Sequence, residues 1–329
     1  MIFKCKNCGG NTVYSPEKHI MICPYCDSEE SDERQEPSSA ALDVCPNCGG
    51  HFELQEHTSA MQCPFCENYL IFNERVEGAF APRLIIPFQV GKETCKGIIR
   101  GKFKKYRFAP TDFLSETRLN ETQGMYVPYW FYDYDVNADF KGEGTKTRSW
   151  TSGNVQYTEH SFYDVERNLD YSFRKIPVDA SVQMPDDVMD LMEPYDYQQL
   201  DAFKPEYLSG FFAEKYNMNA DVVEFRGRQK MMESVSIMTR NTYSEYSGIR
   251  ELRNQTDIRN HSDQYGLLPV WRYLYSYKGT TYPYYVNGQT GKVVGTAPVS
   301  KGKVWAYAGT LWLCLTLLLS ISTAILRML

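Results

Sequence analysis

Hydrophobic and polar positions alternate most regularly in the middle of the chain, between Val127 and Phe140. One face of this stretch is aromatic or apolar and the other is acidic or amide: Trp130, Tyr132, Tyr134, Val136, Ala138 and Phe140 against Asp133, Asp135, Asn137 and Asp139. A period of two predicts a long strand with one buried face. Gly142-Glu143-Gly144 is expected to form a turn, followed by antiparallel strands over residues 155–165 and 169–176.

The alternation returns late in the chain, where Trp271, Tyr273, Tyr275 and Tyr277 share one face. Asn287-Gly288 then predicts a hairpin with a type I′ turn. Helical spacing between these strand groups predicts helices over residues 186–192, 206–216 and 221–238. All but four of the 25 tyrosines lie within residues 79–300. This region is expected to be an α+β domain built on an aromatic-rich antiparallel sheet.

A basic segment, residues 92–107, precedes the first strand group. As a helix it gathers apolar residues on one side and basic residues on a neighbouring stripe: Cys95, Ile98, Ile99, Phe103 and Tyr106 beside Lys92, Lys96, Arg100, Lys104 and Arg107. The stripe suits contact with acidic lipid headgroups or with an acidic linker. A core-packed helix with a solvated charged face is the alternative.

Residues 304–326 carry no charge and predict a transmembrane helix of about 34 Å at 1.5 Å per residue. Trp305 lies where an interfacial aromatic residue belongs. Lys301 and Lys303 precede the segment and Arg327 follows it, a bias that predicts a cytoplasmic amino-terminal side. We therefore expect a single-pass anchor over residues 301–329 in the cytoplasmic membrane.

Eight of the ten cysteines form one unit written twice, with a period of 40 residues: Cys5, Cys8, Cys23 and Cys26, then Cys45, Cys48, Cys63 and Cys66. Paired CxxC turns supply four thiolates in a tetrahedron, which predicts two structural Zn²⁺ ions and leaves no open position for catalysis. The spacing disfavours disulfides. Zinc ribbons are expected over residues 1–27 and 45–78, the second closed by a strand at Tyr69–Phe72.

Residues 28–44 are rich in acidic residues and serine, and they predict a flexible linker that holds the ribbons apart. Residues 1–80 hold five basic and thirteen acidic side chains, a formal charge of −8, whereas the whole chain carries −6. Nucleic-acid binding requires a basic footprint. The ribbons are therefore expected to meet a protein and not a nucleic acid.

Sequence motifs for catalysis are missing from the chain. It has no phosphate-binding loop, dinucleotide fingerprint, HExxH or GxSxG. Asp133, Asp135 and Asp139 share one strand face and suit cation binding or acid–base chemistry, but they lack a partner base, and a solvated sheet face is the simpler interpretation. No catalytic residue and no small-molecule substrate are expected, and the protein is predicted not to be an enzyme.

Several phrases carry a family resemblance: Cys45-Pro46-Asn47-Cys48-Gly49-Gly50, Cys63-Pro64-Phe65-Cys66, Ile86-Pro87-Phe88 and Tyr126-Val127-Pro128-Tyr129-Trp130-Phe131-Tyr132. Together they resemble the TFIIB-type zinc-ribbon membrane proteins of the YdjG type from Bacillus-related bacteria. The resemblance implies a membrane protein of the envelope-stress response. Its implied partners are a flotillin-like (SPFH) protein and a phage-shock-type membrane-binding protein.

These observations lead to one main hypothesis, a membrane-anchored zinc-ribbon adaptor that recruits a cytosolic protein partner to the bilayer. A membrane-tethered nucleic-acid-binding regulator is the alternative. An enzyme that uses the aspartate-lined sheet face is a third possibility. A basic ribbon surface would favour the second hypothesis, and a deep pocket at Asp133 or Asp135 would favour the third.

Overall fold

The computed structural model describes residues 1–30, 32–36 and 42–328, with side chains described except at residue 260 and beyond residue 323. The helices are α1 (Lys92–Phe103), α2 (Glu116–Leu119), α3 (Asp186–Met192), α4 (Ala220–Asn241) and α5 (Lys301–Met328). The strands are β1 (Ile2–Cys5), β2 (Val13–Ser15), β3 (Ile20–Ile22), β4 (Asp32–Gln35), β5 (Thr58–Gln62), β6 (Tyr69–Ile71), β7 (Leu84–Ile85), β8 (Gln123–Ser152), β9 (Val155–Asp179), β10 (Asp201–Ala202), β11 (Phe212–Glu214), β12 (Gly248–Tyr277), β13 (Thr280–Asn287) and β14 (Val293–Val294). The prediction of a mixed α and β chain is confirmed.

One sheet dominates the molecule. Among the described residues it has ten strands in the order β10-β7-β12-β8-β11-β5-β6, with β9 added to β8 and the β13–β14 hairpin added to β12. Most pairs are antiparallel, as predicted, but β11 runs parallel to β8 and β7 runs parallel to β12. The parallel strands have two or three residues each, which is too short for a period of two to be visible in the sequence.

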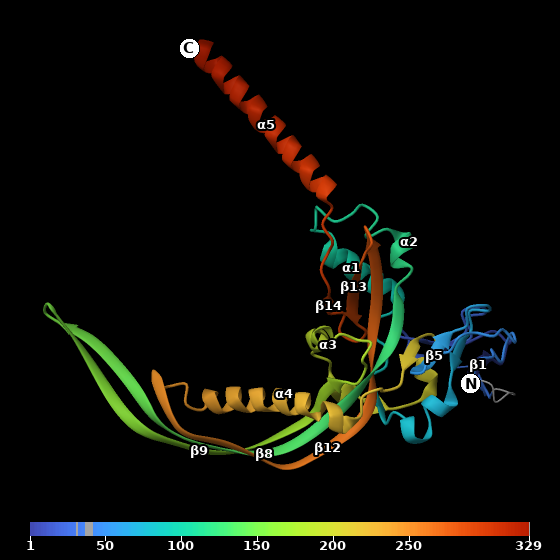
Figure 1. Cartoon of the computed structure of the whole chain (residues 1–329), viewed down its shortest axis with the longest axis horizontal. Coiled ribbons are helices and arrows are strands. Elements are labelled where there is room, and N and C mark those ends of the chain that lie inside the picture. Colours follow the sequence, from blue (N-terminus) through green and yellow to red (C-terminus); the bar gives the residue numbers. More distant parts are fainter. Residues whose placement is uncertain (31, 37–41, 329) are drawn as a thin grey trace.

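Strands β8, β9 and β12 extend from the core as a long curved arm, which we define as residues 133–175 and 248–262 (Figure 1). The alternation expected for Val127–Phe140 is confirmed, with Tyr134, Val136 and Ala138 buried. The turn expected at Gly142-Glu143-Gly144 is wrong, because β8 continues to Ser152. A Cβ at Gly144 would lie 2.6 Å from the Tyr246 ring, so this glycine permits close packing within a strand.

Helix α4 lies along the arm and covers part of one face (Figure 1). Its buried residues recur every four positions and face the apolar side of the sheet: Val223, Gly227, Met231, Val235 and Thr239. Gly227 lies at the closest approach, since a Cβ there would be 2.9 Å from both the Tyr132 ring and the Tyr134 hydroxyl. The helices expected at residues 186–192 and 221–238 are thus present as α3 and α4.

The other end of the sheet packs against α1. Tyr273, Tyr275 and Tyr284 are buried there with Phe103 and Phe113. The predicted hairpin after β13 is present, but its turn is not the expected two-residue type. Asn287 Oδ1 instead accepts hydrogen bonds from the backbone of residues 289 and 290, at 2.9 and 2.8 Å. The two-residue turn lies between β12 and β13, at residues 278–279, where both φ angles are positive (51° and 79°).

The helix predicted over residues 206–216 is wrong. A short 3₁₀ turn over Pro205–Leu208 is followed by Gly210, whose φ of +104° ends any helix. Strand β11 follows and fills the place between β8 and β5. Tertiary pairing therefore overrides the local helical spacing, which is the usual outcome for a segment of this length.

The linker also differs from its prediction. Residues 31 and 37–41 of the expected linker lie outside the described residues, but residues 32–35 form β4, which pairs antiparallel with β1. The two ribbons are not held apart, because Ile2 packs in one apolar cluster with Leu70 and Phe72 of the second ribbon. The backbone of Met1 and Ile71 is joined by a 3.0 Å hydrogen bond. The ribbons therefore form one packed unit.

Candidate metal centres

Each cysteine unit is shaped by two tight turns that aim two thiols inward. In the first unit, the N–H of Cys5 donates to the carbonyl of Gly10 at 2.7 Å, and the N–H of Cys23 donates to the carbonyl of Ser28 at 3.0 Å. Gly9 and Asp27 take positive φ angles of 73° and 54° at the two turns. This backbone reversal explains why a glycine follows the first CxxC pair.

The second unit repeats the same backbone arrangement. Cys45 donates to Gly50 at 2.9 Å, and Cys63 donates to Asn68 at 2.8 Å. Gly49 has a φ of 71°, close to the value at Gly9. The repeat seen in the sequence is thus a repeat of local structure, and the corresponding thiols occupy corresponding places.

The sulfur atoms have the spacing of a tetrahedral metal site. In both units the four thiols lie within 4.8 Å of one another. The Cys5–Cys26 and Cys8–Cys23 sulfurs are 3.7 and 3.5 Å apart, and the Cys45–Cys66 and Cys48–Cys63 sulfurs are 3.7 and 3.9 Å apart. A tetrahedron with metal–sulfur bonds of about 2.3 Å has edges of about 3.8 Å. All eight predicted cysteines therefore fit two four-thiolate sites, consistent with zinc ribbons.

Polar groups around Cys26 and Cys66 favour the deprotonated form of these two thiols, whereas burial raises the pKa of Cys45 and of Cys63. The pKa of Cys8 is raised too, against the hydrogen bond from the Gly10 N–H, by the neighbouring Cys23 and Cys26 thiols. The Ser28 hydroxyl lies 3.0 Å from Cys26 Sγ, and this hydrogen bond lowers the pKa of the Cys26 thiol. Burial raises the pKa of Cys66, but hydrogen bonds from the Asn68 backbone and the Asn47 amide bring it down to about 7. Ready formation of the thiolate suits metal ligation.

One aromatic side chain stands at the tip of each unit. Tyr25 and Phe65 occupy the same position between the second pair of cysteines, and they are 71% and 63% exposed. Each ring lies over a glycine, since a Cβ at Gly10 or Gly50 would come within 2.6 Å of it. The glycines therefore hold the rings in place, while the outer faces of the rings remain open to solvent.

Both ribbons dock firmly on the large sheet. Ribbon 1 does so through β2, where the Tyr14 N–H donates to the Ser209 carbonyl at 2.8 Å and the Ser209 hydroxyl donates to the Thr12 carbonyl at 2.6 Å. Ribbon 2 contributes β5, which pairs antiparallel with β11. The arrangement fixes the metal centres relative to the sheet.

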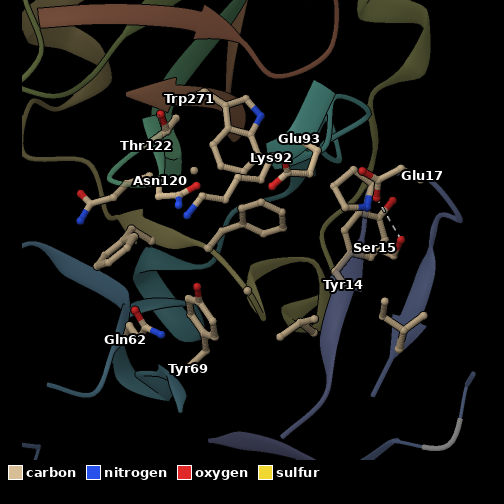
Figure 2. A pocket seen from close by; sticks show the side chains of 18 of the residues that line it. Tyr14, Ser15, Glu17, Gln62, Tyr69, Lys92, Glu93, Asn120, Thr122 and Trp271 are labelled. Atoms are coloured by element: carbon tan, nitrogen blue, oxygen red, sulfur yellow. Dashed lines mark hydrogen bonds between the residues drawn. The ribbon is translucent and has the colours of Figure 1, made fainter. Parts of the chain in front are cut away.

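A cavity of about 440 Å³ opens where ribbon 1, ribbon 2 and the sheet meet. Figure 2 shows the labelled side chains of Tyr14, Tyr69, Lys92 and Trp271 around it, contributed by β2, β6, α1 and β12. Its size is that of a small-molecule or peptide pocket. No sequence pattern predicts this cavity, because its walls come from segments whose docking no local pattern reveals.

The aspartates of the sheet face are occupied by basic neighbours. Asp133 Oδ1 accepts from the Lys175 backbone at 2.8 Å, Asp135 lies 2.7 Å from Arg174, and Asp139 lies 2.7 Å from Arg253. These contacts suit a solvated, ion-paired surface.

The predicted membrane-flanking residues lie at or within α5. This helix is long and apolar enough to cross a membrane over Lys301–Thr323. Lys301, Lys303 and Trp305 occupy its first turns. Arg327 belongs to the helix backbone, and its side chain lies outside the described part of the chain.

Comparison with known proteins adds a family to this geometry. The chain is 36% identical over 314 residues to the uncharacterized protein YdjG of Bacillus subtilis (strain 168), covering 93% of this chain and 92% of YdjG. The chain belongs to the YdjG family. No protein-family model and no solved structure matches it. Because YdjG is itself uncharacterized, a function for the YdjG family has to be argued from residues.

Proposed function

We propose that the protein is a membrane-anchored zinc-ribbon adaptor that recruits a cytosolic protein partner to the cytoplasmic membrane. The observation that carries the proposal is the pair of exposed rings, Tyr25 and Phe65, at matching tips of two closed four-thiol sites. Exposed aromatic side chains on rigid supports are typical of protein-binding surfaces. A site with four thiolates has no free position for catalysis.

Zinc is the metal that these sites suit best. Thiolate ligands favour soft or borderline metals, and a tetrahedral set of four sulfurs is typical of structural zinc. Zinc-bound thiolates persist in a reducing compartment, so this assignment supports a cytosolic location of the ribbons. The lysines in the first turn of α5, Lys301 and Lys303, support the same orientation.

The charge around the rings indicates the kind of partner. Tyr25 is followed closely by Asp27, Glu29 and Glu30, and Phe65 is followed by Glu67. Two four-thiolate zinc sites would add further negative charge. The surface therefore suits a protein with an apolar patch and a basic rim, and it disfavours nucleic acid. The family resemblance makes a flotillin-like or phage-shock-type protein the first candidate.

Replacement of both rings tests the proposal in cells. Tyr25→Ser with Phe65→Ser removes exposed apolar surface, while the eight thiols remain and the metal content should stay at two. Phe162→Ser with Tyr157→Ser on the arm is the matched control, because these rings are 72% and 46% exposed and far from the thiols in sequence. Fluorescent flotillin-like and phage-shock-type proteins are imaged in cells that carry each variant.

The expected result is loss of partner foci at the membrane in the ribbon variant and unchanged foci in the control. Unchanged foci of both partners in the ribbon variant would refute recruitment through the rings. The nucleic-acid alternative makes a different prediction. The full chain in nanodiscs would then bind a DNA fragment, and its affinity would fall steeply with rising salt.

A further inference from the structure

The basic segment of residues 92–107 is helical only to Phe103, where α1 ends, and it divides into two parts that differ in charge compensation. In the first part, Lys96 is only 3% exposed, and its amine lies 2.5 Å from Glu93 and 2.8 Å from Glu116. The Asn120 side chain accepts a third bond from the same amine at 2.7 Å. Arg100 pairs with Glu116 as well. The protein itself therefore neutralises Lys96 and Arg100, so a wholly solvated basic stripe is wrong for Lys96.

Beyond Arg100 the compensation stops. Four cations follow within six residues, all of them exposed: Lys102, Lys104, Lys105 and Arg107. Among the described residues none of the four has an ion pair with a carboxylate. The nearby carboxylate of Asp112 is engaged elsewhere, since it accepts from the Tyr275 hydroxyl at 2.8 Å. A run of unpaired like charges is costly unless an anion or water faces it.

These cations lie at the base of α5. The Ser300 N–H donates to the Phe108 carbonyl at 2.7 Å, and the Lys303 amine donates to the Ala109 carbonyl at 2.7 Å. The rings of Phe108 and Tyr307 make an edge contact at 5.5 Å. In Figure 1 the connection that follows α1 lies beside the start of α5. These contacts hold the end of the basic segment beside the first turns of α5, where the apolar helix leaves the rest of the protein.

We propose that Lys102, Lys104, Lys105 and Arg107, together with Lys301 and Lys303, bind the anionic lipid headgroups of the leaflet that α5 enters. The inference rests on the proposed function, because α5 must cross the membrane. Headgroup phosphates lie at that depth, and each basic residue at the surface adds attraction to anionic lipid. Tyr106 and Trp305, 49% and 77% exposed, are amphipathic side chains that suit the same interfacial layer.

Such a surface has a consequence for the adaptor. A single helix lets the domain above it swivel, whereas a second contact beside the helix restricts its tilt. Headgroup binding would hold the sheet, and the metal centres docked on it, at a fixed orientation to the membrane. The apolar side of α1 then belongs to the protein core, and the exposed cations at its end and in the turn after it belong to the bilayer surface.

The test uses the full chain in phosphatidylcholine vesicles that contain phosphatidylglycerol. Either lipid is supplied with brominated acyl chains, which quench Trp305 and Trp312 of α5 on contact. The ratio of quenching gives the relative affinity for the anionic lipid. Co-flotation with vesicles after carbonate extraction reports insertion separately.

We expect wild-type protein to prefer phosphatidylglycerol by about three- to fivefold at low salt. In about 0.5 M salt the quenching ratio should fall towards one, because salt screens exposed charges. The combined variant Lys102→Gln, Lys104→Gln, Lys105→Gln and Arg107→Gln should lower the ratio most of the way towards one, since only Lys301 and Lys303 remain of the surface. The matched control neutralises four arm cations, by Lys146→Gln, Arg148→Gln, Arg250→Gln and Arg253→Gln, and should keep the preference.

Each outcome is decisive. Protein that fails to float with vesicles refutes both the anchor and the lipid surface. Protein that inserts but shows a wild-type ratio of one refutes the lipid surface alone. An equal loss of the phosphatidylglycerol preference in both variants would refute the lipid surface, because the preference would then follow from net charge alone. Binding of a DNA fragment by inserted wild type, abolished by the 102–107 exchange, would reassign the surface to nucleic acid.

Discussion

Loss of one cysteine from each metal centre should have unequal effects on the molecule. Cys8→Ser removes a ligand from ribbon 1, and Cys48→Ser removes the corresponding ligand from ribbon 2. Ribbon 2 supplies β5 to the large sheet, and its closing strand β6 holds the backbone of Met1. Ribbon 1 instead docks from outside through β2. Damage to ribbon 2 should therefore spread further.

Metal binding is a large part of what stabilises either ribbon. The apolar cluster that they share has three fully apolar buried side chains, Ile2, Leu70 and Phe72. Their burial contributes roughly 5–9 kcal/mol in total, at about 1.5–3 kcal/mol each. A structural zinc site contributes about 10–16 kcal/mol of binding energy that is coupled to folding. Neither ribbon should keep its fold once its metal is lost.

Native mass spectrometry and hydrogen exchange measure the two effects. Each variant should hold one metal ion in place of two. In Cys8→Ser, amides of β1 to β4 should lose protection while β5 and β11 keep theirs. In Cys48→Ser, β5, β6 and β11 should all lose protection, and β1 should follow. Cys314→Ser is the control, because this cysteine lies in α5, away from both sites, and the variant should keep two ions.

Two results would refute this reasoning. Retention of two metal ions by either cysteine variant would show that the four thiols are not a common ligand set. Full protection of β11 in Cys48→Ser would show that the edge of the large sheet does not depend on ribbon 2. In that case the docking seen through Ala60 and Ala213 would be dispensable for the sheet.

Three further predictions concern the free energy of unfolding. Gly227→Ala should lower the free energy of unfolding by about 1–2 kcal/mol in thermal denaturation, because crowding of Tyr132 and Tyr134 at 2.9 Å outweighs a helix-propensity gain of about 1 kcal/mol. The new Cβ of Gly101→Ala in α1 would meet nothing within 4 Å, so this variant should raise the free energy of unfolding by up to about 1 kcal/mol. A lower free energy of unfolding for Gly101→Ala would contradict this reasoning. The Asp179 side chain is buried 2.8 Å from Arg226, and burial raises the pKa of its carboxyl group from 3.8 to about 6. Folding therefore favours the protonated form of Asp179. The contribution of this group to the free energy of unfolding declines as pH rises from about 4 to 6. In denaturant titrations, the free energy of unfolding of Asp179→Asn should therefore rise relative to that of wild type by up to roughly 3 kcal/mol over this pH window. A relative free energy of unfolding that falls over the same window would show that Arg226 keeps the carboxylate ionised.

Sequence patterns predicted the features of the structure that depend only on residues close together in the chain. The cysteine spacing predicted both ligand sets because each CxxC turn is made by its own few residues. The alternation around Tyr134 predicted the central strand because one face of it is buried along its length. The apolar run after Lys303 predicted α5 because its length and uninterrupted hydropathy are properties of that segment alone.

Long-range pairing is what the sequence could not reveal. Strand β11 has three residues, and its place between β5 and β8 depends on segments more than 80 residues away. Docking of the ribbons depends on β11 and on Ser209. The expected flexible linker was wrong at residues 32–35, because these residues form β4 and pair with β1. The division of the chain at residues 27, 44, 78 and 300 stays a prediction. The cavity beside Trp271 was missed because it exists only once these parts are assembled.

The arm gives the molecule an unusual reach. Strand β8 has 30 residues, and at about 3.3 Å per residue it measures about 100 Å, more than twice the thickness of a bilayer with its headgroups. In Figure 1 the arm leaves the end of the sheet that lies away from α5 and sweeps to one side. Neighbouring copies that diffuse in one membrane would therefore collide at their arm tips, where Trp150 and Tyr157 are exposed, well before their anchoring helices could touch. The footprint of each copy is set by its longest hairpin and not by its single helix.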